Sequence, residues 1–219
     1  MAVARTVEPE WLDTLEPEDP RAQRSRRDLA RLNAIMRNAG IVARELRGVA
    51  LSRIAEIGAG DGAFAVRLAG RLRGNAAFVL LDRQTAVVPA ARDGWRFEAA
   101  TRDAIDWLED EATGTFDAIV ANLFLHHFED AALARLLAAI ARRTSRFVAC
   151  EPRRSALALG ASRLVGFVGC NDVTRHDAVA SVRAGFRDRE ISGLWRTAGW
   201  RLEEGSRGLF SHLFTASRP

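Results

Sequence analysis

The hydrophobic positions of this chain alternate between short apolar runs and longer stretches with helical spacing. The apolar, β-prone runs predict strands near residues 51–57, 77–82, 95–99, 115–121 and 145–151. Between them, apolar residues recur every three or four positions, which predicts helices near residues 62–73, 84–92, 102–110 and 129–143. Strands that alternate with helices favour a mostly parallel sheet covered by helices on both faces.

The segment before this alternating core has two parts. Residues 1–20 are acidic and contain three prolines, which predicts an extended arm. From Arg21 to Leu46, apolar residues with helical spacing are interspersed with arginines, and Gly40 is the expected break between two helices.

The segment after the fifth strand departs from a plain strand–helix unit. Residues 153–188 predict a helical insert with a turn at 169–172. A helix over 191–198, ended by Gly199, should follow. Two final strands are expected at 200–202 and 209–216.

The composition indicates one folded domain. The chain has 219 residues, of which 48% are hydrophobic and 27% charged. No apolar run is long enough to span a bilayer, so stable membrane insertion is not expected. The acidic N-terminal segment argues against a signal or transit peptide, which makes a cytoplasmic location the expectation. Two cysteines are too few for a disulfide framework or a cysteine zinc site.

The basic isoelectric point changes this picture little. The pI of 10.5 arises from a sequence that contains arginine but no lysine or tyrosine, and the arginines are spread along the chain. A net charge of +4 distributed in this way favours solvated helix faces over a nucleic-acid surface. No nucleic-acid partner is therefore expected.

The most informative motif is Glu56-Ile57-Gly58-Ala59-Gly60-Asp61-Gly62. It follows the first predicted strand and precedes a predicted helix, as a nucleotide-binding loop does in a doubly wound sheet. Glycines suit this position because the backbone can turn sharply and approach a ligand closely without a Cβ. The motif also satisfies GxGxxG/A, so by itself it leaves a nicotinamide cofactor open.

The loop resembles motif I of the class I methyltransferases that use S-adenosylmethionine (SAM). The resemblance continues over residues 50–152: Asp82 ends the second strand, Asp103 follows the third and Asn122 ends the fourth. The stretch from Leu125 to Asp130 is similar to the LHHxxD motif of the small-molecule branch related to the ubiquinone and menaquinone enzymes.

This resemblance implies an α/β, doubly wound (Rossmann-like) fold with a mostly parallel seven-stranded sheet and an antiparallel last strand. Residues 1–48 would form an N-terminal arm and cap helices, and residues 49–219 the SAM-binding core. The helical insert at 153–188, after the fifth strand, would be a lid over the substrate.

The resemblance also assigns cofactor contacts. Glu56 would act on the ammonium end of SAM, Asp82 on the ribose hydroxyls and Asp103 on the adenine amino group. A helix N-cap is the competing interpretation for both aspartates. The full set of expected cofactor-binding residues is Glu56, Gly58, Ala59, Gly60, Gly62, Asp82, Arg83, Asp103, Ala104 and Asn122.

Three histidines are candidate catalytic bases: His126, His127 and His176. An imidazole with a pKa near 6.5 can take a phenolic or enolic proton at neutral pH. Adjacent side chains diverge, so His126 and His127 are poorly spaced for one metal, and no metal site is expected. One of the two should face the pocket while the other packs or caps. A hydrogen-bonded core histidine is the alternative for each.

Together these features predict methyl transfer from SAM to an O, C or N nucleophile of a small, lipophilic or aromatic molecule, with S-adenosylhomocysteine (SAH) as product. A quinone-, polyketide- or phenol-like acceptor and a biosynthetic role are expected. The alternatives are an NAD(P)-dependent oxidoreductase, which the lack of a Tyr–Lys pair disfavours, and a non-catalytic SAM-fold binding protein. An RNA methyltransferase is disfavoured because Asn122-Leu123-Phe124-Leu125 lacks the prolines of an Asn-Pro-Pro-Tyr motif. Monomer and homodimer both stay open.

Overall fold

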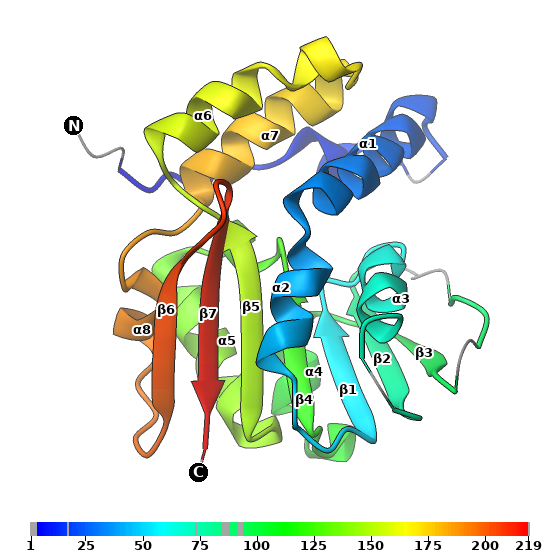
Figure 1. The fold of residues 1–219 in the computed structure, drawn as a ribbon, viewed down its shortest axis with the longest axis vertical. Coiled ribbons are helices and arrows are strands. Elements are labelled where there is room, and N and C mark those ends of the chain that lie inside the picture. The colour runs from blue at the N-terminus through cyan, green and yellow to red at the C-terminus, as the bar shows by residue number, and fades with distance from the viewer. Residues whose placement is uncertain (1–3, 17, 73, 85–87, 92–93, 219) are drawn as a thin grey trace.

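A seven-stranded sheet forms the centre of the molecule (Figure 1). The structure is a computed structural model that describes residues 4–16, 18–72, 74–84, 88–91 and 94–218. The strand order is β3-β2-β1-β4-β5-β7-β6, and β7 runs antiparallel to both of its neighbours. The strands are β1 (Arg53–Ile57), β2 (Ala77–Asp82), β3 (Arg96–Thr101), β4 (Ala118–Asn122), β5 (Arg146–Pro152), β6 (Arg201–Arg207) and β7 (Ser211–Ser217). The predicted mostly parallel sheet with an antiparallel last strand is confirmed.

Helices cover both faces of the sheet because its central strands are apolar on both sides. In β4, Ile119 and Ala121 contribute to one buried cluster, whereas Ala118 and Val120 contribute to the other. One face is covered by α2 (Asn38–Glu45) and α3 (Ala63–Ala69). The opposite face is covered by α4 (Ala104–Glu109), α5 (Asp130–Arg143) and α8 (Glu190–Leu194).

A cap of helices lies over the carboxyl ends of β1, β4 and β5, at the top of Figure 1. It is formed by α1 (Pro20–Met36), α6 (Ala156–Arg163) and α7 (Asp172–Ala184), together with two 3₁₀ helices, η1 (Trp11–Thr14) and η4 (Val165–Val168). Two further 3₁₀ helices, η2 (Glu111–Thr113) and η3 (Leu125–His127), precede and follow β4 in the chain. Residues 11–36 and residues 156–184, which are far apart in the sequence, thus meet above the sheet.

The N-terminal segment differs from its predicted form at two points. The break between the helices falls at Arg37, which adopts φ = 60°, and Gly40 lies inside α2. The acidic arm contains η1, and Asp19 caps α1 by accepting a hydrogen bond from the Arg21 backbone N–H. Capping by Asp19 suits Pro20 at the first helical position, where the missing N–H costs nothing.

Two predicted helices are shorter or absent. In the helix expected at 84–92, Gln84 and residues 88–91 are not helical, and the other residues of that range lie outside the described ones. Pro89 disfavours a helix there because it lacks an N–H and restricts the preceding residue. The helix expected at 191–198 ends at Leu194, since Trp195 turns in to pack against Phe214.

Candidate cofactor and acceptor site

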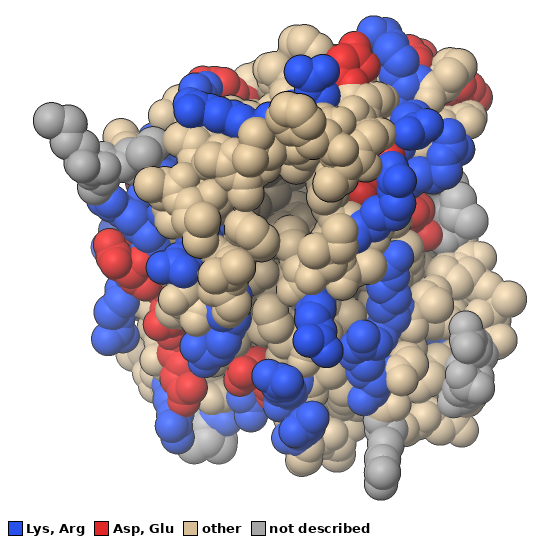
Figure 2. Space-filling view, turned by 45° about the horizontal axis from the view of Figure 1, so that its top comes forward, with Lys and Arg blue, Asp and Glu red and all other residues tan. Residues whose placement is uncertain are grey.

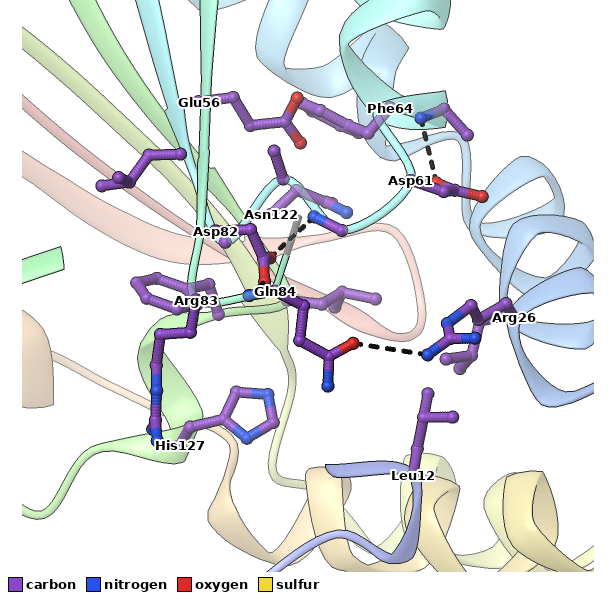
Figure 3. Close-up of a pocket in the computed structure, with 18 of the residues that line it drawn as sticks. Leu12, Arg26, Glu56, Asp61, Phe64, Asp82, Arg83, Gln84, Asn122 and His127 are labelled. Carbon is purple, nitrogen blue, oxygen red and sulfur yellow. Dashed lines mark hydrogen bonds between the residues drawn. The ribbon is translucent and has the colours of Figure 1, made fainter. Parts of the chain in front are cut away.

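A cavity of about 580 Å³ lies between the cap and the carboxyl ends of β1, β2 and β4. Such a volume is typical of a small-molecule site. The glycine loop and the ends of β2 and β4 line one side, while η1 and α1 contribute the other. In the view of Figure 3, Glu56 and Asp61 lie at one end, Asp82 in the middle, and His127 and Leu12 at the other end.

The glycine loop exposes backbone to this cavity. Gly58, Gly60 and Gly62 adopt φ values of 71°, 54° and 71°, which disfavour other residues. A Cβ at Gly58 would lie 2.2 Å from the Phe124 ring, so this glycine is required for packing. A Cβ at Gly60 would meet no atom within 4 Å, so at Gly60 the loop opens onto space that a ligand can fill.

Glu56 is a buried carboxyl group at the cavity wall. Its Oε2 atom has no hydrogen-bond partner among the described residues. Burial raises the pKa of Glu56 well above its usual value, and the negative charges of Asp61 and Asp82 raise it further. A cationic group would supply the missing partner, so Glu56 fits the ammonium of an amino acid.

Asp82 holds the glycine loop while facing the cavity. Its Oδ2 accepts the Gly60 backbone N–H at 2.8 Å, and its Oδ1 accepts that of Gln84 at 2.9 Å. Arg83 and Gln84, which directly follow Asp82, are not helical, so nothing in the described residues supports its competing interpretation as an N-cap. Ionised carboxylate oxygens accept more than one hydrogen bond each, which leaves capacity for ligand hydroxyls.

Asp103 is a helix N-cap and also lies in the cavity wall. Its Oδ1 caps α4 by accepting the backbone N–H groups of Ile105, at 2.9 Å, and Asp106, at 3.3 Å. Asp103, Ala104 and Arg83 also line the cavity. The N-cap hydrogen bonds fix the direction of the Asp103 carboxyl group. Its contact with a ligand stays a prediction.

The remaining predicted cofactor residues fall into two groups. The first group lines the cavity and consists of Gly58, Ala59, Gly60 and Asn122. Gly62 is not among the lining residues; it packs closely against other side chains, because an added Cβ would lie 3.0–3.3 Å from Leu80 and Pro89. Asn122 is buried, and its Oδ1 accepts a hydrogen bond from Asn38 at 2.9 Å. Asn38 in turn accepts from the Ser211 hydroxyl at 2.8 Å, which ties α2 to β4 and β7.

His126 is enclosed between two carboxylates. Its Nδ1 lies 2.9 Å from Glu151 and its Nε2 lies 3.3 Å from Glu10. Burial lowers the pKa of His126, but the hydrogen bonds and charges of the two glutamates outweigh that effect and raise it to about 9. Burial likewise disfavours the Glu10 carboxylate, yet His126 lowers the pKa of Glu10 to about 2. His126 is therefore a cation at neutral pH and cannot accept a proton there.

His127 has the opposite electrostatics. It is half-buried at the cavity wall, with its Nδ1 3.7 Å from the Asp13 carboxylate. Burial and the positive charge of His126 lower the pKa of His127 below its ordinary value. The ring is consequently neutral at pH 7, with a nitrogen able to accept a proton. Both histidines line the cavity, but their protonation states differ.

His176 stands apart from the residues that line the cavity. Its ring stacks on Trp11 at 4.0 Å between centroids, and its Nδ1 lies 2.9 Å from Asp177. Asp177 also accepts the backbone N–H groups of Trp11 and Leu12, at 2.8 and 3.0 Å. Asp177 is a partner of His176, but the pair holds η1 in place rather than facing the cavity.

The sequence reasoning missed the contribution of the N-terminal segment. Glu10, Leu12 and Asp13 line the cavity, although residues 1–20 were expected to be an extended arm. A dense run of carboxylates gives no indication of which one turns inward. The only signal is that Trp11 and Leu12 interrupt the acidic run, because apolar residues in such a segment favour docking.

Glu10 of this segment also completes a group of three potential metal ligands. Glu10, His126 and His127 each offer a ligand atom, and these atoms lie within 4.8 Å of one another. Both ring nitrogens of His126 already face carboxylates. The expectation of no metal stays a prediction.

Comparisons with known proteins agree with this arrangement. Residues 54–146 match the family described as "Methyltransferase domain". No curated protein matches the sequence. Among the described residues, no helix is both long and apolar enough to cross a membrane.

Solved structures with the same fold are distant in sequence. An O-methyltransferase family protein from Burkholderia thailandensis is 20% identical in sequence and superimposes with a TM-score of 0.63. The match covers 92% of this chain and 60% of that protein. The plantazolicin methyltransferase BpumL, in complex with a desmethylplantazolicin analogue and SAH, is 13% identical in sequence and has a TM-score of 0.70. The match covers 92% of this chain and 91% of the BpumL chain. Magnesium protoporphyrin IX methyltransferase from Synechocystis PCC 6803, with bound SAH, is 14% identical in sequence and has a TM-score of 0.54. The match covers 87% of this chain and 84% of that methyltransferase chain.

Proposed function

Because residues 54–146 match a methyltransferase domain, we propose that the protein transfers the methyl group of SAM to an oxygen, carbon or nitrogen of a small lipophilic or aromatic molecule. SAM is the cofactor of this family. The predicted methyltransferase family, fold and cofactor are thereby confirmed, whereas the resemblance to the ubiquinone and menaquinone branch stays a prediction. The acceptor and the roles of individual residues belong to the proposal.

The observation that carries the proposal is the unpartnered carboxyl oxygen of Glu56 beside the open glycine loop. The methionine part of SAM brings an ammonium group, which would ionise Glu56 and pair with it. Asp82, at the middle of the cavity, would then accept the ribose hydroxyls. A dinucleotide fits less well, because its anionic pyrophosphate would lie against Glu56 and Asp61.

The proposed mechanism relies mainly on alignment. When bound, SAM supplies an electrophilic methyl group, so the protein's task is to orient the acceptor and exclude water. Alignment of this kind contributes roughly 7–11 kcal/mol in model reactions. The cap, including η1, covers the cavity, which supports a role of the cap in positioning the acceptor and keeping water out.

The acceptor end of the cavity supports an aromatic or lipophilic molecule with an acidic proton. Leu12, Phe124 and Phe128 line it around the neutral His127. A phenolic or enolic hydroxyl at this end would transfer its proton to His127 as the oxygen attacks the methyl carbon. Similar folds occur in a plantazolicin methyltransferase and in the mitomycin 7-O-methyltransferase MmcR, which supports the small-molecule class.

Calorimetry with SAH, NADH and NADPH tests the cofactor assignment. We expect SAH alone to bind, and Asp82→Ala to weaken that binding about tenfold or more, because hydrogen bonds to a charged group are lost. Asp106→Ala, which removes an exposed carboxylate on α4, is the matched control and should bind SAH like the wild type. Binding of a nicotinamide cofactor alone, or equal SAH affinity in Asp82→Ala, would overturn the proposal.

A further inference from the structure

The tip of the cap carries large apolar side chains that the core does not use. Leu157, Leu164, Phe167 and Val168 are 57%, 56%, 88% and 60% exposed. Leu157 and Leu164 are seven residues apart, so they lie on one face of α6 and its end. None of the residues of η4, which contains Phe167 and Val168, is buried. We call these four side chains the apolar tip.

Folding alone gives no reason for such exposure. Monomeric soluble proteins rarely expose large contiguous apolar patches except where they bind something. Phe167 is the most exposed of the large hydrophobic residues described, and replacing it with a polar residue would leave every described core contact in place. The apolar tip therefore has the character of a contact surface.

The charges around the apolar tip have one predominant sign. Between Glu151 and Asp172 the sequence contains no acidic residue, and Arg163 is exposed at the end of α6, whereas Arg154 is buried and pairs with Glu190. Two more arginines reach η4 from neighbouring helices. Arg24 donates a hydrogen bond to the Gly169 carbonyl at 2.9 Å, and the side chain of Arg175 lies against Gly166.

Figure 2 shows a broad uncharged area on the face formed by the upper part of the molecule, with arginine side chains and some acidic side chains at its margins. Two acidic residues moderate this charge: Asp28 pairs with Arg24, and Asp172 is exposed at the start of α7. Arg163 and Arg175 remain exposed beside the apolar tip.

We propose that the apolar tip docks on the surface of an anionic lipid bilayer. Exposed aliphatic and aromatic side chains flanked by arginines match the boundary between acyl chains and anionic head groups. A second copy of this chain is a poorer occupant, since a two-fold interface at the tip would bring the arginines of both copies together. Docking is proposed as peripheral, because no helix in the described part of the chain is long and apolar enough to cross a membrane.

Docking would place the cap, and with it the cavity, next to the lipid phase. The inference rests on the surface alone and not on the methyl acceptor. Its test therefore needs no catalytic activity.

Co-sedimentation of the full chain with vesicles tests the proposal. We expect binding to vesicles in which about a third of the lipid is phosphatidylglycerol, with weaker binding to pure phosphatidylcholine and at high salt. Phe167→Asp should weaken binding more than tenfold. Arg163→Glu should weaken binding to the anionic vesicles at least about fivefold, because one arginine near the surface contributes about that factor. Leu209→Asp, at a residue 59% exposed in the β6–β7 turn, is the matched control and should bind normally.

Melting temperature and SAH affinity of the three variants show that they are folded. The proposal is overturned if the wild type fails to bind anionic vesicles, or if Phe167→Asp binds like the wild type. It is also overturned if the wild type self-associates without lipid and Phe167→Asp abolishes that association, since the tip would then be an interface between copies.

Discussion

At the scale of single residues, Glu56 illustrates how a binding site is kept at the expense of stability. A buried carboxyl oxygen without a partner is unfavourable for the folded protein. Its raised pKa means that the folded state binds a proton more tightly than the unfolded state. The group therefore reduces stability progressively as the pH rises above its unfolded value of 4.5, toward its folded pKa.

Glu56→Gln should separate these two effects. The amide has the same shape and no charge, so we expect the melting temperature of the ligand-free variant at neutral pH to equal or exceed that of the wild type. SAH affinity should fall about tenfold or more, because the ion pair with the ammonium is lost. Differential scanning fluorimetry and calorimetry measure the two quantities. A variant that loses stability but keeps its SAH affinity would show that Glu56 is structural.

The two adjacent histidines show how position overrides residue type. His126 contacts Glu10 and Glu151, which keep it protonated, whereas His127 next to this cation is kept neutral. The same side chain thus serves as a buried cation at one position and as a candidate base at the next.

His127→Ala should lower kcat about 100-fold while SAH affinity and folding persist, since only proton transfer is lost. In the wild type, the acid limb of the kcat/KM profile should have its midpoint below pH 6.5, because the pKa of His127 is lowered. Asp13→Asn should move that limb to still lower pH, since the Asp13 charge raises the pKa of His127.

His126→Ala is the contrasting variant. It leaves the buried Glu10 and Glu151 without their shared cation, so we expect a loss of stability of about 3–5 kcal/mol. Equal and negligible effects of the two substitutions on turnover would exclude both histidines as the base.

At the scale of elements, the N-terminal segment is held by contacts with η3 and α7. Glu10 contacts His126 from η3 and Ser181 from α7. Asp177 binds the backbone of η1, and His176 stacks on Trp11. Polar anchors rather than an apolar core thus fix the segment that closes the cavity.

This attachment should depend on pH. The pKa of His126 is raised from 6.5 to about 9, so its stabilisation is complete below pH 6.5 and is lost as the pH rises toward 9. The pKa of Glu10 is lowered from 4.5 to about 2, so its stabilisation is present above pH 4.5 and is lost toward pH 2. The contact is therefore strongest between pH 4.5 and 6.5.

Glu10→Gln should reduce the fall in unfolding free energy between pH 6.5 and pH 9, by on the order of 1 kcal/mol, because His126 then keeps only one carboxylate. Urea unfolding followed by tryptophan fluorescence at the two pH values measures it. Glu8→Gln, which changes an exposed residue 3.9 Å from Arg183, is the control. The same pH dependence in wild type and Glu10→Gln would mean that Glu10 does not set the protonation of His126.

At the scale of the whole molecule, the site is formed by joining two parts of different origin. The sheet supplies the glycine loop and the polar residues at its strand ends, where parallel sheets commonly bind ligands. The cap supplies the covering side chains from η1, α1 and α7. Only their union encloses a volume suited to a cofactor and an acceptor.

We expect methyl transfer in this cavity to need no metal ion. The carboxylates of Glu10 and Glu151 already satisfy His126, which leaves the group of Glu10, His126 and His127 without a free ligand set. Treatment with EDTA should therefore leave turnover and melting temperature unchanged, and added Zn²⁺ should not raise the melting temperature. Loss of activity on chelation, restored by one divalent cation, would assign a metal to this group.

The sequence by itself determined the parts of the fold and site that depend on local pattern. Short apolar runs alternating with helical spacing specify the parallel core, because both faces of such strands must be buried. The glycine loop and the positions of Asp82 and Asp103 follow from the ends of these strands. These residues lie within a few positions of the element that orients them, so chain order is sufficient to group them.

Only the tertiary structure decided which residues enclose the site and in which charge state. The contact of Glu10 with His126 joins residues 116 positions apart, and no local pattern encodes it. Burial beside two carboxylates makes His126 a cation, and that cation keeps His127 neutral, although the sequence presents them as equivalent neighbours. Desolvation and charge–charge interactions depend on distance in space rather than along the chain, which is why folding had to bring the N-terminal segment over the sheet before the candidate base could be identified.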